Sequence, residues 1–127
     1  MFKLDNKHTL LEMAQVGKFA DYTCSVYGKE GSVPHFHFYT KDKKISGCIR
    51  LDAPDYFVHG KHKSKLSSKE RKQLMEWLNS FHEGYKKLGV ELTIYSYICI
   101  LWNDNNQEYL FEAPENMPDY TQLPVKD

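Results

Sequence analysis

The stretch VPHFHFYTKDKKISGC, residues 33–48, predicts two antiparallel strands joined by a polar turn. PHFHFYT is rich in aromatic residues, KDKK forms the turn, and ISGCIRLD (45–52) alternates apolar with polar residues. Pro34 suits the first position of a strand, because it cannot donate to a ladder. Together with DYTCSVYG (21–28), these segments predict a three-stranded antiparallel meander with order beginning near Phe19.

The two histidines of this stretch share one face of the predicted strand. His35 and His37 point to one side, and Phe36 and Phe38 point to the other, because side chains alternate along a strand. The two phenylalanines belong in the core. We therefore expect the imidazoles on an open face of the sheet, within reach of solvent.

The histidine face suits more than one kind of chemistry. Neutral imidazole and thiolate are ordinary ligands for divalent metal ions such as zinc. The candidate metal ligands come from the two strands and the loop after them: His35, His37, Cys48, His59 and His62. Alternatively, His35 or His37 could act as a catalytic general acid or base, with Arg50 beside a phosphodiester. The remaining interpretation is a polar face that binds a partner or recognises nothing.

LSSKERKQLMEWLNSFHEGYKKLG (66–89) predicts an amphipathic helix over 67–87. Ser67 and Glu70 form the Ser-x-x-Glu pattern of a capping box, and apolar residues recur at helical spacing from Leu74 to Leu88. The composition of LTIYSYICILWNDNN (92–106) favours a strand, whereas the spacing of its apolar residues after Thr93 fits a helix. Both readings stay open for residues 92–104 on this basis.

Length, composition and the pattern of elements predict a single α+β domain over residues 1–127, a three- or four-stranded antiparallel sheet packed on one face by two helices. Residues 1–18 form an N-terminal segment, and residues 107–127 form an acidic, proline-containing tail that should lie extended along the surface. Three widely spaced cysteines argue against a disulfide framework. No apolar stretch approaches the ~20 residues that cross a bilayer, and the first residues lack a signal-peptide pattern. We expect a cytoplasmic protein without a membrane partner.

Charge is unevenly distributed along a chain whose net charge is zero. Residues 1–87 hold 16 Lys and Arg against 10 Asp and Glu, whereas residues 88–127 hold 1 against 7. A basic run could meet nucleic acid or an acidic protein partner. Its members lie between residues 59 and 72: Lys61, Lys63, Lys65, Lys69, Arg71 and Lys72. An acidic tail reaching the basic run of a second copy would also fit a homodimer.

Four stretches resemble a family of small bacterial and mobile-element proteins known only as a domain of unknown function. They are VPHFHFYTKDKKISGCIRLD (33–52), HGKHKSKLSSKERKQLMEWLNS (59–80), LWNDNN (101–106) and MPDYT (117–121), and Pro34-His35-x-His37 is the most distinctive part. The resemblance implies an α+β domain often encoded beside antitoxin-like genes, with no established activity. It also implies a helix over 92–104.

Two functions follow as expectations. The first is an interaction module of a toxin–antitoxin or mobile-element system, which would use the basic run to bind a protein or nucleic acid. The second is a small metal-dependent or histidine-dependent hydrolase, such as a ribonuclease-like toxin, with His35 and His37 at its centre. The sequence shows no P-loop, Rossmann fingerprint, Gly-x-Ser-x-Gly elbow or His-Glu-x-x-His motif.

Overall fold

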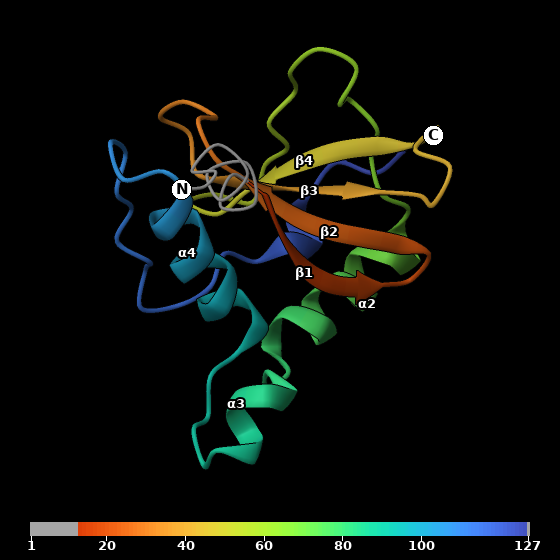
Figure 1. Ribbon diagram of the computed structural model, residues 1–127. Coiled ribbons are helices and arrows are strands. Elements are labelled where there is room, and N and C mark those ends of the chain that lie inside the picture. Colours follow the sequence, from red (N-terminus) through yellow and green to blue (C-terminus); the bar gives the residue numbers. More distant parts are fainter. Residues whose placement is uncertain (1–12, 127) are drawn as a thin grey trace.

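A computed structural model describes residues 13–126 and places a four-stranded antiparallel sheet against helices (Figure 1). The α+β class expected from the sequence is confirmed. Each strand pairs with the next one along the chain, so the sheet is a simple meander. In this order the strands are β1 (Met13–Phe19), β2 (Tyr22–Tyr27), β3 (His35–Tyr39) and β4 (Ser46–Arg50).

β1 extends the predicted three-stranded meander by one edge strand. It pairs antiparallel with β2 from Met13 to Phe19, with an irregularity between Gln15 and Gly17. Regular structure therefore begins at Met13 within the described residues, and the expected start near Phe19 is wrong. The rest of the predicted N-terminal segment lies outside the described residues.

One face of the sheet forms the hydrophobic core. Phe36 and Phe38 of β3 are fully buried, as the alternation predicts. They lie beside Cys24 and Val26 of β2 and Ile49 of β4 in a single apolar cluster. Residues of α2 (Ser68–Asn79) and α4 (Ile94–Asn105) complete this cluster and cover the face: Leu74, Leu78, Ile94, Tyr95, Ile98, Cys99 and Trp102.

The predicted helix over 67–87 is two helices, so its continuity was wrong. α2 begins with the expected capping box between Ser67 and Glu70. It ends at Ser80, whose backbone is extended, and α3 (Glu83–Lys87) starts after the cap His82. The interruption pairs with another part of the chain, because the His82 amide donates to the Leu92 carbonyl. This pairing replaces the helical bonds that a continuous helix would make.

Residues 94–105 form the helix α4, which decides between the two readings of this segment. The Thr93 side chain accepts from the Ser96 amide and caps the first turn. Ile98 and Trp102 face the core one helical turn apart. Burial of this apolar face outweighs the strand preference of its β-branched residues. No helix among residues 13–126 combines the length and the apolar character needed to cross a membrane.

The C-terminal tail is anchored in the core near its end. Tyr120 lies in the 3-10 helix η1 (Tyr120–Gln122), and both Tyr120 and Leu123 are fully buried. Arg71 of α2 donates to the carbonyls of Thr121 and Leu123, at 2.5 and 2.6 Å. The expectation of a tail that only lies extended on the surface therefore fails at residues 120–123.

Candidate metal centre

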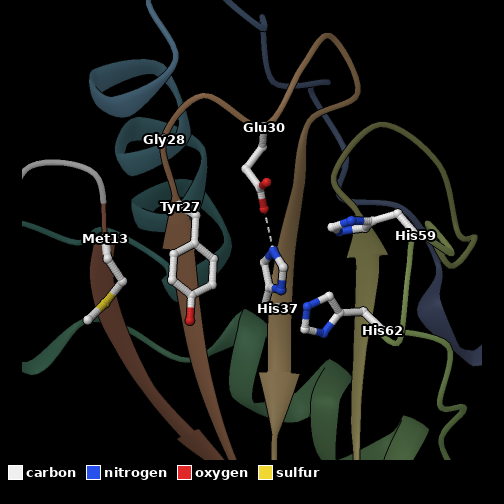
Figure 2. A pocket seen from close by; sticks show the side chains of 7 residues that line it. All are labelled: Met13, Tyr27, Gly28, Glu30, His37, His59 and His62. Atoms are coloured by element: carbon white, nitrogen blue, oxygen red, sulfur yellow. Dashed lines mark hydrogen bonds and ion pairs between the residues drawn. The ribbon is translucent and has the colours of Figure 1, made fainter. Parts of the chain in front are cut away.

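The second face of the sheet carries a cluster of imidazoles around a carboxylate. His37 of β3 lies between Glu30, from the loop before this strand, and His62, from a loop after β4 (Figure 2). His59 comes from the same loop, where it forms an isolated bridge with His62. The ring centres of His37 and His62 are 4.9 Å apart. The chain thus brings together residues from three separate segments.

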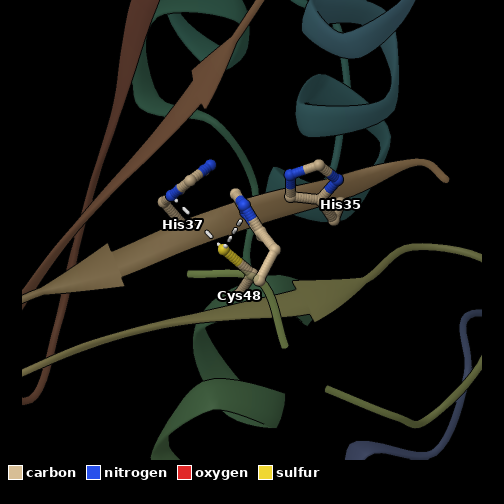
Figure 3. Close-up of side chains that lie close together, drawn as sticks. His35, His37 and Cys48 are labelled. Carbon is tan, nitrogen blue, oxygen red and sulfur yellow. Dashed lines mark hydrogen bonds between the residues drawn. The ribbon is translucent and has the colours of Figure 1, made fainter. Parts of the chain in front are cut away.

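Four of the five predicted metal ligands form one compact group. His35 and His37 lie on β3, and Cys48 lies on the neighbouring strand β4, with its thiol beside His37 (Figure 3). One potential ligand atom from each of His35, His37, Cys48 and His59 lies within 4.8 Å of the other three. This group could hold a metal ion.

The predicted open histidine face is wrong, because a segment of chain covers it. His35 and His37 are only 1% and 3% exposed. Residues 56–62, here called the covering segment, run beside β4, where the Phe57 amide donates to the Cys48 carbonyl. The Phe57 ring lies 4.7 Å from the ring of His35. This segment has no sequence periodicity, so the alternation of the strands gave no sign of it.

Hydrogen-bond partners that can only accept fix the protons of two imidazoles. His35 Nδ1 lies 2.7 Å from the Val33 carbonyl, so this nitrogen carries the proton. In the neutral ring, the lone pair is then on Nε2. His37 Nε2 lies 2.6 Å from Glu30 Oε1 and donates to it, which leaves the lone pair of the neutral ring on Nδ1.

Glu30 orients the ring of His37, and the sequence patterns did not indicate this residue. Its Oε1 also lies 3.3 Å from His35 Nε2, where two acceptors meet if the ring is neutral. The ring nitrogens of His35 and His37 beside its carboxylate hold the pKa of Glu30 well below its usual range. The Glu30 amide donates to the Asn106 side chain after α4, which fixes the loop. The only sequence feature that could have indicated Glu30 is its position as an acidic residue five residues before His35.

Burial lowers the pKa of two imidazoles, His37 and His62, and raises that of the Cys48 thiol. It lowers the pKa of His37, although the hydrogen bond to Glu30 opposes this change. It also lowers the pKa of His62, with a further contribution from His59. Burial, together with the charge of Glu30, holds the pKa of Cys48 well above its usual range. Without a cation, Cys48 is therefore a neutral thiol; a bound metal would favour its thiolate.

Contacts around Cys48 are close to the spacing that a tetrahedral ion requires. Cys48 Sγ lies 3.3 Å from His37 Nδ1 and 3.3 Å from His59 Nε2. Bonds of about 2.1 Å to nitrogen and about 2.3 Å to sulfur imply that ligand atoms around zinc lie roughly 3.3 to 3.7 Å apart. His35 offers Nε2, because its other nitrogen is bound to Val33. The donor set of three imidazoles and one thiol suits zinc.

The other predicted site residues lie at the edge of the group or outside it. His62 is not among the four, but its ring stands next to His37 and its Nδ1 lies 3.0 Å from Ser46 Oγ. Arg50 instead makes a two-pronged ion pair with Asp52, at 2.8 and 2.9 Å. The backbone of Arg50 pairs with that of His35 across β3 and β4, and its catalytic role stays a prediction.

The basic run is exposed except at Arg71, which is half-buried. Arg71 does not belong to a free basic surface, because it holds the C-terminal tail through the Thr121 and Leu123 carbonyls. The remaining members are exposed: Lys61, Lys63, Lys65, Lys69 and Lys72. Lys61 lies on the covering segment, between His59 and His62, so part of the run adjoins the metal-capable group.

A pocket of about 460 Å³ opens beside the group (Figure 2). His37 and His59 line it, together with Glu30, Tyr27 and His62. Two of the four metal-capable residues therefore border a space that water can enter. Comparison of the chain with known protein families, with curated proteins and with solved structures finds no match.

Proposed function

We propose that the protein is a metal-dependent hydrolase that binds a zinc ion through His35, His37, Cys48 and His59. The observation that carries this proposal is the orientation of His37, whose Nε2 donates to Glu30 while its Nδ1 faces the Cys48 thiol. Imidazoles that ligate metals commonly donate their second nitrogen to a carboxylate in this way. The metal-capable group therefore has both a ligand set and the support that holds it.

The pocket supports a catalytic role in addition to a structural one. Structural zinc sites are closed, whereas catalytic sites leave one position open to water or substrate. Four protein ligands would fill a tetrahedral zinc, so hydrolysis requires His59 to leave the ion and give its position to water; His59 comes from a half-buried loop at the pocket wall, whereas the other three ligands sit on rigid strands. A bound zinc would supply an activated water with a pKa near 7. His62, held by Ser46 Oγ, stands on this wall in position to transfer a proton.

Metal content of the purified protein tests the proposal. The chain is produced in zinc-supplemented medium and purified without chelator or immobilised nickel, then analysed for metals by mass spectrometry. We expect about one zinc per chain, and loss of zinc in His37→Ala combined with Cys48→Ser. Cys99→Ala, which changes a buried cysteine of α4 outside the group, is the matched control and should retain zinc.

Two outcomes would overturn different parts of the proposal. If the wild-type protein contains no stoichiometric zinc, or if the double variant retains it, the proposed zinc site is wrong. If zinc is bound, the hydrolase is tested with the activated diester bis(p-nitrophenyl) phosphate, which zinc-loaded wild type should cleave faster than His62→Ala. Equal rates for zinc-loaded and zinc-free protein would leave a structural zinc site without catalysis.

The exposed lysines favour a second function of a different class. Lys63, Lys65 and Lys69 are exposed and close in sequence, as expected for a surface that meets an acidic protein or a phosphate backbone. An interaction module of a toxin–antitoxin or mobile-element system, and a homodimer through the acidic tail, both stay predictions. Retention on nucleic acid that falls steeply with salt would support the module.

A further inference from the structure

A smaller cavity adjoins the metal-capable group on the side of the lysines. Its volume is about 210 Å³, and it shares Tyr27, His37 and His62 with the larger pocket. The smaller cavity is distinguished by the residues that only it contacts: Tyr39, Lys43, Ser46 and Lys61. The two cavities thus meet at His37, one of the four residues that could hold the ion.

The two cavities differ in charge. Glu30 lines the larger one, whereas no carboxylate of residues 13–126 lines the smaller one. Two lysines, Lys43 and Lys61, line the smaller cavity. The Lys43 ammonium lies 5.5 Å from the centre of the Tyr39 ring, which holds it there by a cation–π contact. Lys61 is an exposed residue of the covering segment and directly precedes His62 in the sequence.

Hydroxyl groups add neutral donors to this positive wall. Ser46 Oγ lies 3.0 Å from His62 Nδ1, so the hydroxyl is positioned by a ring that also lines the cavity. The Tyr39 hydroxyl is fixed by Ser25 at 2.7 Å. Lysines as point charges, together with hydroxyl donors, form a common environment for a phosphate group. The cavity is smaller than the roughly 300 Å³ of sites for whole drug-sized ligands, so it suits one such group.

We propose that this cavity binds the phosphate group of a phosphate ester through Lys43 and Lys61, beside the ion held by the metal-capable group. The inference rests on the proposed function and names its substrate class. A phosphate seated between the lysines would lie next to His37, where the ion could reach its ester oxygens. The phosphate of a small ester and that of a nucleic-acid backbone offer the same oxygens to these side chains.

Direct binding of phosphate to the full, zinc-loaded chain tests this subsite. Inorganic phosphate is titrated by calorimetry into wild type and into Lys43→Gly combined with Lys61→Ala. Lys43 has a positive φ of 62°, a conformation that glycine adopts without strain, so the first change should not destabilise the turn. We expect affinity to fall about tenfold or more in the double variant. Lys65→Ala removes a neighbouring charge that does not line the cavity and should change affinity less than twofold.

Two further probes, phenyl phosphate and a short single-stranded RNA, distinguish a small ester from a nucleic acid. The probe that binds with the higher affinity identifies the source of the phosphate group. Equal phosphate affinity in wild type and the double variant would overturn the subsite. Phosphate that binds to the zinc ion alone, without the lysines, would give this result. Lysine-dependent phosphate binding to a chain that fails to take up zinc would support the subsite and overturn the zinc site.

Discussion

The two faces of the sheet are both buried, but by different means. Phe36 and Phe38 lie under α2 and α4, whose apolar residues pack on them. On the other side of the same strand, His35 and His37 lie under the covering segment, with Glu30 at their nitrogens. The first face is buried by regular amphipathic elements, whereas the second is buried mostly by irregular chain that carries its own polar groups, with Trp102 of α4 beside His35 at a ring distance of 5.3 Å.

This difference has an energetic consequence. Burial of apolar side chains is favourable by itself, whereas burial of polar groups costs free energy unless each finds a partner. On the histidine face, Val33 and Glu30 satisfy one nitrogen of each β3 imidazole. The lone pairs that remain meet at Cys48 and Glu30, and a cation would satisfy them together. Truncation should therefore cost more stability on the apolar face, and metal should affect the histidine face.

The largest expected effect is on the apolar face. Phe38→Ala removes a fully buried ring and should lower the free energy of unfolding by about 3–5 kcal/mol, with or without zinc. His37→Ala on the other face should cost about 1–3 kcal/mol in chelator, because it removes one hydrogen bond to Glu30. Urea unfolding followed by far-ultraviolet circular dichroism measures both. If His37→Ala in chelator lowers the free energy of unfolding more than Phe38→Ala does, the proposed difference between the two faces is wrong.

A smaller effect, confined to the histidine face, is expected from Glu30→Gln. The amide keeps an acceptor for His37 Nε2 but removes the charge that makes the imidazole a stronger ligand. Zinc affinity should fall about 10- to 100-fold, and the free energy of unfolding in chelator should also fall, because the hydrogen bond from His37 loses its charged acceptor. Competition with a chromophoric chelator measures the affinity. Glu112→Gln, on the exposed tail, makes the same charge change and should leave affinity unaltered. Unchanged affinity in Glu30→Gln would show that this carboxylate does not support the site.

The sequence predicted the apolar face better than the histidine face. Alternation along β3 identifies Phe36 and Phe38 as core residues, because a period of two is set by the pleat itself. The capping box at Ser67 was confirmed for a similar reason, since the pattern and its hydrogen bonds are local. Where the deciding contacts are distant, prediction failed: the helix stops at Ser80 because residues near it pair with residues 92–94.

The members of the candidate site were predicted by residue type, but its environment was not. His35, His37, Cys48 and His59 form a group as expected. Their burial follows from where the covering segment runs, which no periodicity encodes. Glu30 was missed because it reaches the imidazoles through a loop whose position depends on Asn106, 76 residues further along the chain. Contacts of this kind come from the tertiary fold and leave no pattern in the neighbouring sequence.

The smallest expected effect comes from pH alone, because no side chain is removed. In chelator, burial keeps the pKa of His37 below its ordinary 6.5, and its hydrogen bonds with the imidazoles keep that of Glu30 below 4.5. As pH falls through these ordinary values, the unfolded chain takes up protons that the folded chain does not, so stability decreases. The urea midpoint should therefore fall from pH 8 to pH 4. His37→Asn should flatten this dependence between pH 7 and pH 5, whereas Phe38→Ala should lower every midpoint without changing the trend. A midpoint that rises on acidification would mean that the histidine face is held together by protonated imidazoles instead of neutral ones.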